Sequence, residues 1–210
     1  MDSTNSADFG IENDKINRRS FLAKSIGYTT AGLSLLTLPG ILTETLAANE
    51  GKSKEEIYKA LEEKVEKSYP VYHSCSQTAF AALNDQFGLN ADQTVTAIKL
   101  FAGGIAGKGE TCGAVTGALL AIGFYFDVIK KDNANPRASM QYGGMFFDKF
   151  TKEFESTRCK EVMKHQYGKY IDYSNPDDLK ILGKPENQGK CLDVMKTATH
   201  IVADIILENS

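Results

Sequence analysis

Apolar residues recur at intervals of three and four along most of this chain, and this spacing limits its fold more than any other feature. One example is the series Ile57, Leu61 and Val65, which an amphipathic helix would place on one face. No run of four or more residues alternates convincingly between apolar and polar side chains, as a half-buried strand would require. We therefore predict an all-α fold, a compact single-domain bundle of about six to seven helices.

Residues that favour helix ends divide this bundle into segments. A capping box at residues 53–56 places the start of the first helix at Lys54, and Pro70 should end it near Ser68. The remaining helices are expected at residues 74–88, 91–101, 110–129 and 138–155, with a short helical turn at 176–178 and two further helices opening at Cys159 and Cys191.

The segment 110–129 is predicted to be the central helix, because it carries two different stripes. One stripe is apolar and the other consists of small residues, so neighbours should pack against both sides. The apolar stripe is Val115, Leu119, Ile122 and Phe126, and the small stripe is Gly113, Gly117 and Ala121. In the helix at 138–155, the expected core stripe is Phe147, Phe150 and Phe154.

The N-terminal region resembles an export signal. Arg18 and Arg19 precede Phe21-Leu22, as in the twin-arginine signals of bacteria and archaea. A short, mildly apolar run follows and ends at Pro39, and small residues then favour cleavage after Ala47. We predict a cleavable signal at residues 1–47 and a mature domain at 48–210; the alternative is an N-terminal helix that happens to contain two arginines.

Charge and hydropathy restrict the partners. The chain carries 24 Lys and Arg against 27 Asp and Glu, a net charge of -3, so it has no basic excess for binding nucleic acid. No stretch approaches the 18 or so uninterrupted apolar residues that indicate a permanent membrane span. We expect an exported, periplasmic or otherwise extracytoplasmic protein. The twin-arginine machinery would be its export partner, and that machinery moves folded proteins, so a cofactor could be loaded before export.

Each of the four cysteines falls in the first turn of a predicted helix, in phase with the apolar stripe that follows. A thiol at a helix N-terminus should have a lowered pKa, because the helix dipole and free N–H groups stabilise its thiolate. The spacing contains no CxxC pair and no CxxCH motif, which excludes thioredoxin-type and covalent haem sites. Two readings remain: one site assembled from four helices, or two disulfides.

Glycines surround the second cysteine, Cys112. Gly104 belongs to a glycine-rich run ahead of it, while Gly113 and Gly117 follow it. Such glycines can bring backbone N–H groups close to a bound anion or to cluster sulfurs. We predict that Gly104, Gly113 and Gly117 contribute to cofactor binding; the alternative for the run is a flexible helix connection.

These residues together resemble a known family. The sequence Cys75-Ser76-Gln77, the run Gly103-Gly104-Ile105, the motif Cys112-Gly113-Ala114-Val115-Thr116-Gly117, and then Cys159 and Cys191 follow in order. They are similar to the redox-active family whose signature is C, CGAxxG, C, C, over about residues 55–207. The resemblance implies an α-helical protein with four functional cysteines and a redox role. A more distant likeness is to split-Soret cytochromes, but their haem-attachment motif is missing, so no covalent haem is expected.

The sequence therefore predicts a redox protein with one site at Cys75, Cys112, Cys159 and Cys191. We expect these residues to ligate an iron-sulfur cluster that exchanges electrons with a partner protein, because four thiolates suffice for such a cluster. The alternatives are a dithiol/disulfide redox protein without metal and a non-redox binding or scaffold domain stapled by disulfides. No hydrolase motif such as GxSxG or HExxH is present.

Overall fold

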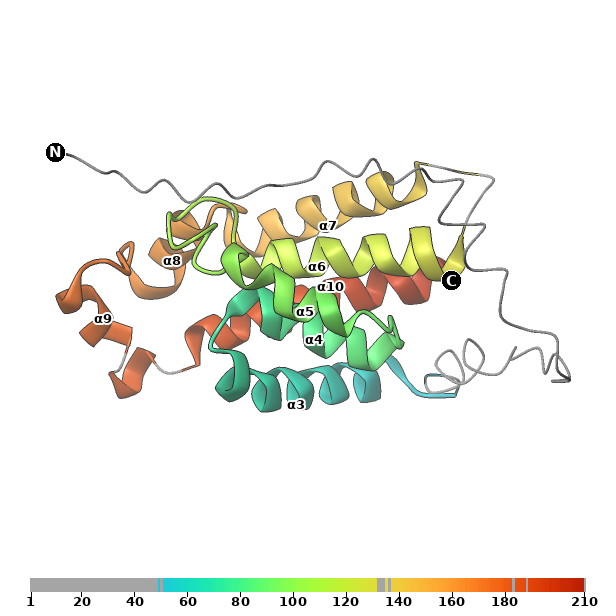
Figure 1. The fold of residues 1–210 in the computed structure, drawn as a ribbon, viewed down its shortest axis with the longest axis horizontal. Helices are drawn as coiled ribbons and strands as arrows, with labels where there is room; N and C mark the ends of the chain where they lie inside the picture. Colours follow the sequence, from blue (N-terminus) through green and yellow to red (C-terminus); the bar gives the residue numbers. More distant parts are fainter. Residues whose placement is uncertain are drawn as a thin grey trace, which may run out of the picture. The chain divides into compact units, whose positions relative to one another are not determined.

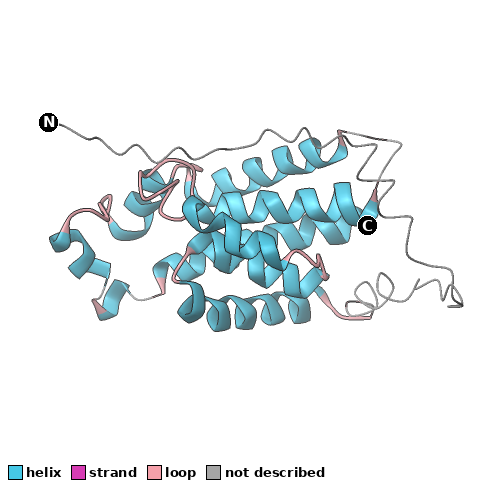
Figure 2. Ribbon diagram, in the orientation of Figure 1, coloured by secondary structure: helices cyan, strands magenta, loops and turns pink. Residues whose placement is uncertain are grey.

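The computed structural model describes residues 49, 51–131, 135, 137–182, 184–187 and 189–209. The predicted export signal at 1–47 lies outside the described residues. Within these ranges the chain forms eight α-helices and no strand, apart from one isolated bridge between Thr111 and Arg158 (Figures 1 and 2). The predicted all-α fold is confirmed.

The helices follow one another along the chain with short 3₁₀ and π-helical extensions. Segment η1 continues α5 as a 3₁₀ turn, and η2 continues α6 as a π-helix. The bounds are α3 Lys54–Tyr72, α4 Cys75–Phe87, α5 Asp92–Ala97, η1 Ile98–Phe101, α6 Gly113–Gly123, η2 Phe124–Lys130, α7 Ala138–Phe154, α8 Cys159–Tyr167, α9 Pro176–Leu182, η3 Pro185–Asn187 and α10 Lys190–Asn209.

Helix α3 begins at its predicted capping box but runs further than expected. Ser53 accepts a hydrogen bond from the backbone of Glu56, and the Glu56 carboxylate accepts one from the backbone of Ser53. The predicted end near residue 68 is wrong, because the helix continues through Pro70 to Tyr72. A proline in the last turn removes only one backbone hydrogen bond, and the packing of α3 against α4 and α10 offsets that loss. His73 then closes the helix in the left-handed conformation, with φ 47°.

Helix α6 is the central packing element, as predicted. It lies against α4, α7 and α10 (Figure 1). Its small-residue side lets α4 approach closely, since a Cβ added at Gly117 would lie 2.6 Å from the carbonyl oxygen of Ser76. Val115, Ile122 and Phe126 of its apolar stripe are buried in the core.

The helical stretch Gly113–Lys130 is long and apolar enough to cross a membrane by length and composition, and it is the one such stretch among the described residues. Half of it is buried inside the protein. Its contacts with α4, α7 and α10 account for its apolar character, because a core helix must be apolar on more than one face.

Helix α7 contributes an aromatic stripe to the core that differs from the expected one at a single residue. Phe146, Phe150 and Phe154 are buried, whereas Phe147 is 37% exposed. The prediction of Phe147 as a core residue is wrong because the buried series advances by four residues, which follows one face of a helix. The ring centroids of Phe146 and Phe150 lie 5.7 Å apart, and those of Phe150 and Phe154 lie 4.7 Å apart. The three rings therefore form one continuous row in the core.

Candidate functional site

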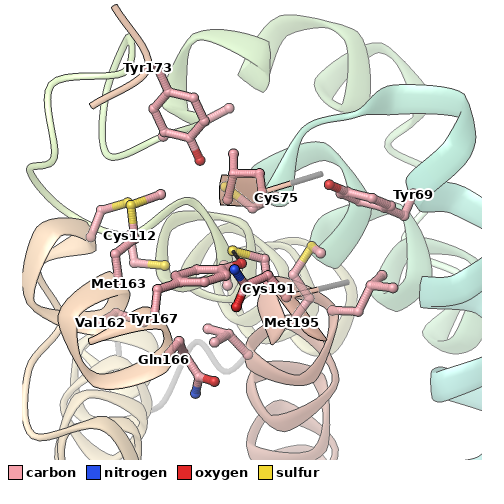
Figure 3. Close-up of a pocket in the computed structure, with 18 of the residues that line it drawn as sticks. Tyr69, Cys75, Cys112, Val162, Met163, Gln166, Tyr167, Tyr173, Cys191 and Met195 are labelled. Atoms are coloured by element: carbon pink, nitrogen blue, oxygen red, sulfur yellow. Dashed lines mark hydrogen bonds between the residues drawn. The ribbon is translucent and has the colours of Figure 1, made fainter. Parts of the chain in front are cut away.

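A cavity of about 600 Å³ lies at the end of the bundle where four helices begin, and all four cysteines line it. Cys75 and Cys159 are the first residues of α4 and α8, Cys112 is the N-cap of α6, and Cys191 is the second residue of α10. Figure 3 shows labelled cysteine side chains gathered around this space. The structure thus brings the four predicted site residues to one cavity.

The cavity lining carries no Asp, Glu, Lys or Arg side chain among the described residues. Besides the cysteines, it consists mainly of tyrosine, methionine, leucine and valine side chains, with a few neutral polar groups such as Gln166 and Asn187. His73 is exposed and also lines this cavity. The site is therefore apolar and nearly uncharged.

Backbone pairing holds Cys112 and Cys159 next to each other. Thr111 and Arg158, the residues just before them, form an isolated antiparallel bridge. The backbone N–H of Cys159 donates a hydrogen bond to the carbonyl of Glu110 at 2.5 Å, and Arg158 Nη2 reaches the carboxylate of Glu110 at 3.1 Å. The two cysteines consequently approach as a pair, although 47 positions separate them along the chain.

The glycine-rich loop before Cys112 packs closely against this pair at Cys159. Gly104 has φ +71°, and a Cβ there would lie 2.5 Å from Cys159 Cβ, so the loop can pass only where no side chain intervenes. Ile105 and Ala106 also have positive φ values, 60° and 51°. Left-handed backbone is unfavourable for a β-branched residue, and strain of this kind is concentrated at functional sites.

The three glycines predicted to bind a cofactor are packing positions in the structure. Gly113 lies against Cys75, because a Cβ there would be 2.3 Å from the Cys75 sulfur. Gly104 abuts Cys159, and Gly117 abuts the backbone of α4. None of the three lines the cavity itself, whereas Gly103, Gly107 and Gly189 do. Direct contact of Gly104, Gly113 and Gly117 with a cofactor stays a prediction.

The predicted lowering of the pKa is wrong for Cys75, Cys112 and Cys191 in the protein without a bound group. Burial raises the pKa of Cys75 to about 11 and that of Cys191 to about 12. The hydrogen bond with Cys159, followed by burial, holds the pKa of Cys112 well above its ordinary value. The N–H groups at the helix ends act in the opposite direction, but desolvation of a thiolate in an apolar cavity outweighs them.

Tyrosines complete the site, and the sequence analysis missed them. The hydroxyl of Tyr167 donates a hydrogen bond to the sulfur of Cys191 at 3.1 Å. Tyr69 and Tyr173 also line the cavity, and their hydroxyl groups point toward Cys75 in Figure 3. Burial raises the pKa of Tyr69, Tyr167 and Tyr173, so each hydroxyl stays protonated and able to donate.

One signal in the sequence could have identified Tyr167. Cys159, Met163 and Tyr167 form a series with a spacing of four residues, and such a series lies along one side of a helix. All three line the cavity. Tyr69 and Tyr173 carried no comparable signal, because they come from other segments and the fold alone brings them to the site.

The side chains around the cavity limit the kind of metal group that could be bound there. The four cysteines are free thiols. Among the described residues, no three His, Cys, Asp or Glu side chains lie close enough together to hold a single metal ion. Four thiols at one cavity are nevertheless the type and number of ligands that an iron-sulfur cluster uses.

The fold and the site define a class: an all-helical protein with four thiols around one apolar cavity. The family described as Putative redox-active protein (C_GCAxxG_C_C) matches residues 73–205, more than half of the chain, and the chain belongs to this family.

No curated protein and no solved structure matches the chain. The likeness to split-Soret cytochromes therefore stays a prediction. The glycine that follows Cys112 in the motif has a structural reason, since a side chain at this position would meet the Cys75 sulfur.

Proposed function

We propose that this protein transfers electrons through an iron-sulfur cluster held by Cys75, Cys112, Cys159 and Cys191. The observation that carries the proposal is the meeting of four helix-terminal thiols at one uncharged cavity. Family membership supports the coarser statement, that the protein is redox-active.

The composition of the site favours a cluster over a single ion. Thiolate sulfur is the ligand that iron-sulfur clusters require, and four cysteines serve either a [2Fe-2S] or a [4Fe-4S] cluster. When bound, such a cluster would accept and return one electron at a time.

The electrostatics of the cavity also suit an anionic group. Each cysteine lies at the N-terminus of a helix, where the helix dipole and unpaired N–H groups favour negative charge. The N–H groups of Gly103, Ala114 and Val115 lower the thiol pKa values, which shows that they are placed to interact with the sulfurs. No carboxylate of a described residue lines the cavity to oppose that charge.

The protein without metal would hold its thiols in the protonated form. Because burial raises the pKa of Cys75 and Cys191 far above neutrality, loading of the site must displace thiol protons. Metal binding should therefore be accompanied by proton release and should weaken as the pH falls.

A second candidate function is supported by the pairing of Cys112 and Cys159. Cys159 raises the pKa of Cys112, and the backbone bridge and hydrogen bonds beside them fix their approach. Oxidation of this pair would remove two electrons and two protons and form one S–S bond. The stapled scaffold has less support, because all four cysteines are free thiols.

Export and partnership complete the proposal. The arginine pair Arg18-Arg19 would direct the folded, loaded protein through the twin-arginine machinery to the periplasm. A partner redox protein would then exchange electrons with the site.

Replacement of single cysteines tests the proposed function. Cys112→Ser, prepared without oxygen, should lose the visible absorbance of an iron-sulfur cluster that the unchanged protein shows. Thr199→Ser, a buried replacement in α10 outside the cavity lining, is the control and should keep it. Equal absorbance in Cys112→Ser and the unchanged protein would contradict ligation by Cys112. Loss of a two-thiol redox titration, without any chromophore in either protein, would favour the dithiol candidate.

A further inference from the structure

The cavity is large enough to hold more than the cysteine sulfurs and the group that they would bind. Its volume of about 600 Å³ falls within the range of roughly 300–1,000 Å³ that is typical of sites for small organic molecules. In Figure 3, the hydroxyls of Tyr69 and Tyr173 approach Cys75 from two sides, and Met195 lies beside Cys191. The cavity thus has a region beside the sulfurs that is lined by other side chains.

The chemistry of this lining selects a neutral ligand. No Asp, Glu, Lys or Arg among the described residues borders the cavity, so a phosphate or a carboxylate would lose its hydration without gaining a counter-charge. The methionine, tyrosine and leucine side chains offer apolar and aromatic contacts instead. A flat ring with little net charge would fit these contacts.

Two tyrosine hydroxyls at the cavity can make it specific for a ligand that accepts hydrogen bonds. The hydroxyls of Tyr69 and Tyr173 have no hydrogen-bond partner among the described residues, in contrast to Tyr167, which is bonded to Cys191. Both reach the region around Cys75 and Cys191, to which their electrostatic interactions also connect them. As protonated hydroxyls they can donate to oxygen acceptors of a ligand.

We propose that the region of the cavity beside the cysteines binds a quinone, a neutral ring whose carbonyl oxygens accept hydrogen bonds from Tyr69 and Tyr173. Quinones are neutral organic molecules that carry electrons, so the choice of this ligand class rests on the proposed redox function. The binding itself depends only on the cavity and the two hydroxyls.

Duroquinone is a suitable probe, because methyl groups occupy all four ring positions to which a thiol could add. Equilibrium dialysis of the oxygen-free protein against duroquinone should show saturable binding at one site. Durene has the same methylated ring but no oxygen atoms, and it should bind more weakly because it cannot accept the tyrosine hydrogen bonds.

The double variant Tyr69→Phe/Tyr173→Phe tests the two hydroxyls. It should bind duroquinone at least about tenfold more weakly, since two hydrogen bonds are lost while the rings remain. Its affinity for durene should be unchanged. Tyr142→Phe is the matched control, because Tyr142 stacks on Phe126 at 4.1 Å and does not line the cavity; it should bind duroquinone as the unchanged protein does.

The proposal is overturned if duroquinone shows no saturable binding, or if the double variant binds it as tightly as the unchanged protein. Iron and sulfide are measured on the same samples. A protein that contains a cluster but does not bind duroquinone would contradict the ligand alone, and a protein that binds duroquinone without a cluster would contradict the cluster alone.

Discussion

Cys112 occupies the N-cap of α6, a position where a serine, threonine or aspartate side chain normally accepts a hydrogen bond from the helix backbone. A buried thiol is a weaker acceptor, so capping does not explain its presence. Its neighbours are Cys159, with which it forms a hydrogen bond, and Gly113, which admits Cys75. The position of Cys112 is better explained by its closeness to the other cysteines of the site than by helix capping.

The raised pKa values predict slow thiol chemistry in the protein without metal. With pKa values of about 11 for Cys75 and about 12 for Cys191, little thiolate exists at pH 8. Alkylation by iodoacetamide should be slow at pH 8 and should accelerate as the pH rises past 10. The measurement is the number of alkylated cysteines against time at several pH values. The same protein unfolded in guanidinium is the control and should react at pH 8. Rapid alkylation of the folded protein at pH 7 would contradict the raised values.

The close contact between Gly113 and Cys75 predicts that one added methyl group at position 113 disturbs the site. In Gly113→Ala, the new Cβ would overlap the Cys75 sulfur at 2.3 Å, so Cys75 or the start of α6 must move. We expect a loss of about 1–3 kcal/mol in the free energy of unfolding and a lower iron content, measured by urea unfolding and metal analysis.

Gly144→Ala is the control for this substitution, because Gly144 lies inside α7 and a Cβ there meets nothing within 4 Å. It should raise the stability by about 0.5–1 kcal/mol, since alanine is the better helix former. Equal effects of the two alanine substitutions would contradict the proposed contact.

At the scale of elements, most helix starts followed from local chemistry. Ser53 and Ser74 cap α3 and α4, and Gly88 closes α4, as the sequence predicted. The end of α3 did not follow, because tertiary packing carried the helix through Pro70. In α7, Phe150 and Phe154 were predicted correctly, but Phe147 was chosen in place of Phe146, since both fit a helical spacing and only the partners of α7 distinguish them.

The segment that leads into α9 depends on Asp178. Its carboxylate accepts hydrogen bonds from Lys169 Nζ at 2.6 Å and from the backbone N–H of Asp172 at 2.9 Å, and these lower its pKa. A lowered pKa in the folded state stabilises the fold above the unfolded value, near 3.8, and this contribution is lost as the pH falls through the folded value.

We therefore expect Asp178→Asn to be less stable than the unchanged protein at pH 7, with the difference shrinking below about pH 4. Urea unfolding of both proteins between pH 7 and pH 2.5 measures it. Asp177→Asn is the control, because Asp177 is largely exposed and forms a surface pair with Lys180; it should have little effect. A difference for Asp178→Asn that stays constant down to pH 2.5 would contradict this role.

At the scale of the whole molecule, the sequence predicted the convergence of the cysteines but not the character of the place where they meet. Helical phase indicated that each thiol points inward, and the structure confirms that all four line one cavity. The direction of the pKa shifts was wrong because local reasoning includes the helix dipole and omits desolvation. The place of the tyrosines in the site could not be predicted, because only the tertiary fold brings Tyr69 and Tyr173 to Cys75.

The predicted export concerns residues outside the described ranges. Replacement of both arginines, Arg18→Lys and Arg19→Lys, should leave the precursor in the cytoplasm, because the twin-arginine signal depends on the pair. Cell fractionation and N-terminal sequencing measure this, and the exported protein should begin near Ala48. Equal export of the double-lysine variant would contradict the assignment.

The central claim is that the four thiols hold an iron-sulfur cluster, and the composition of the protein purified without oxygen tests it most directly. Iron, acid-labile sulfide and alkylatable thiols should be measured on one sample of the folded, unchanged protein. We predict iron and sulfide in equal amounts, with all four cysteines alkylated only after the metal is removed and the chain is unfolded. A folded protein without iron, without sulfide and with no titratable redox couple would contradict the account.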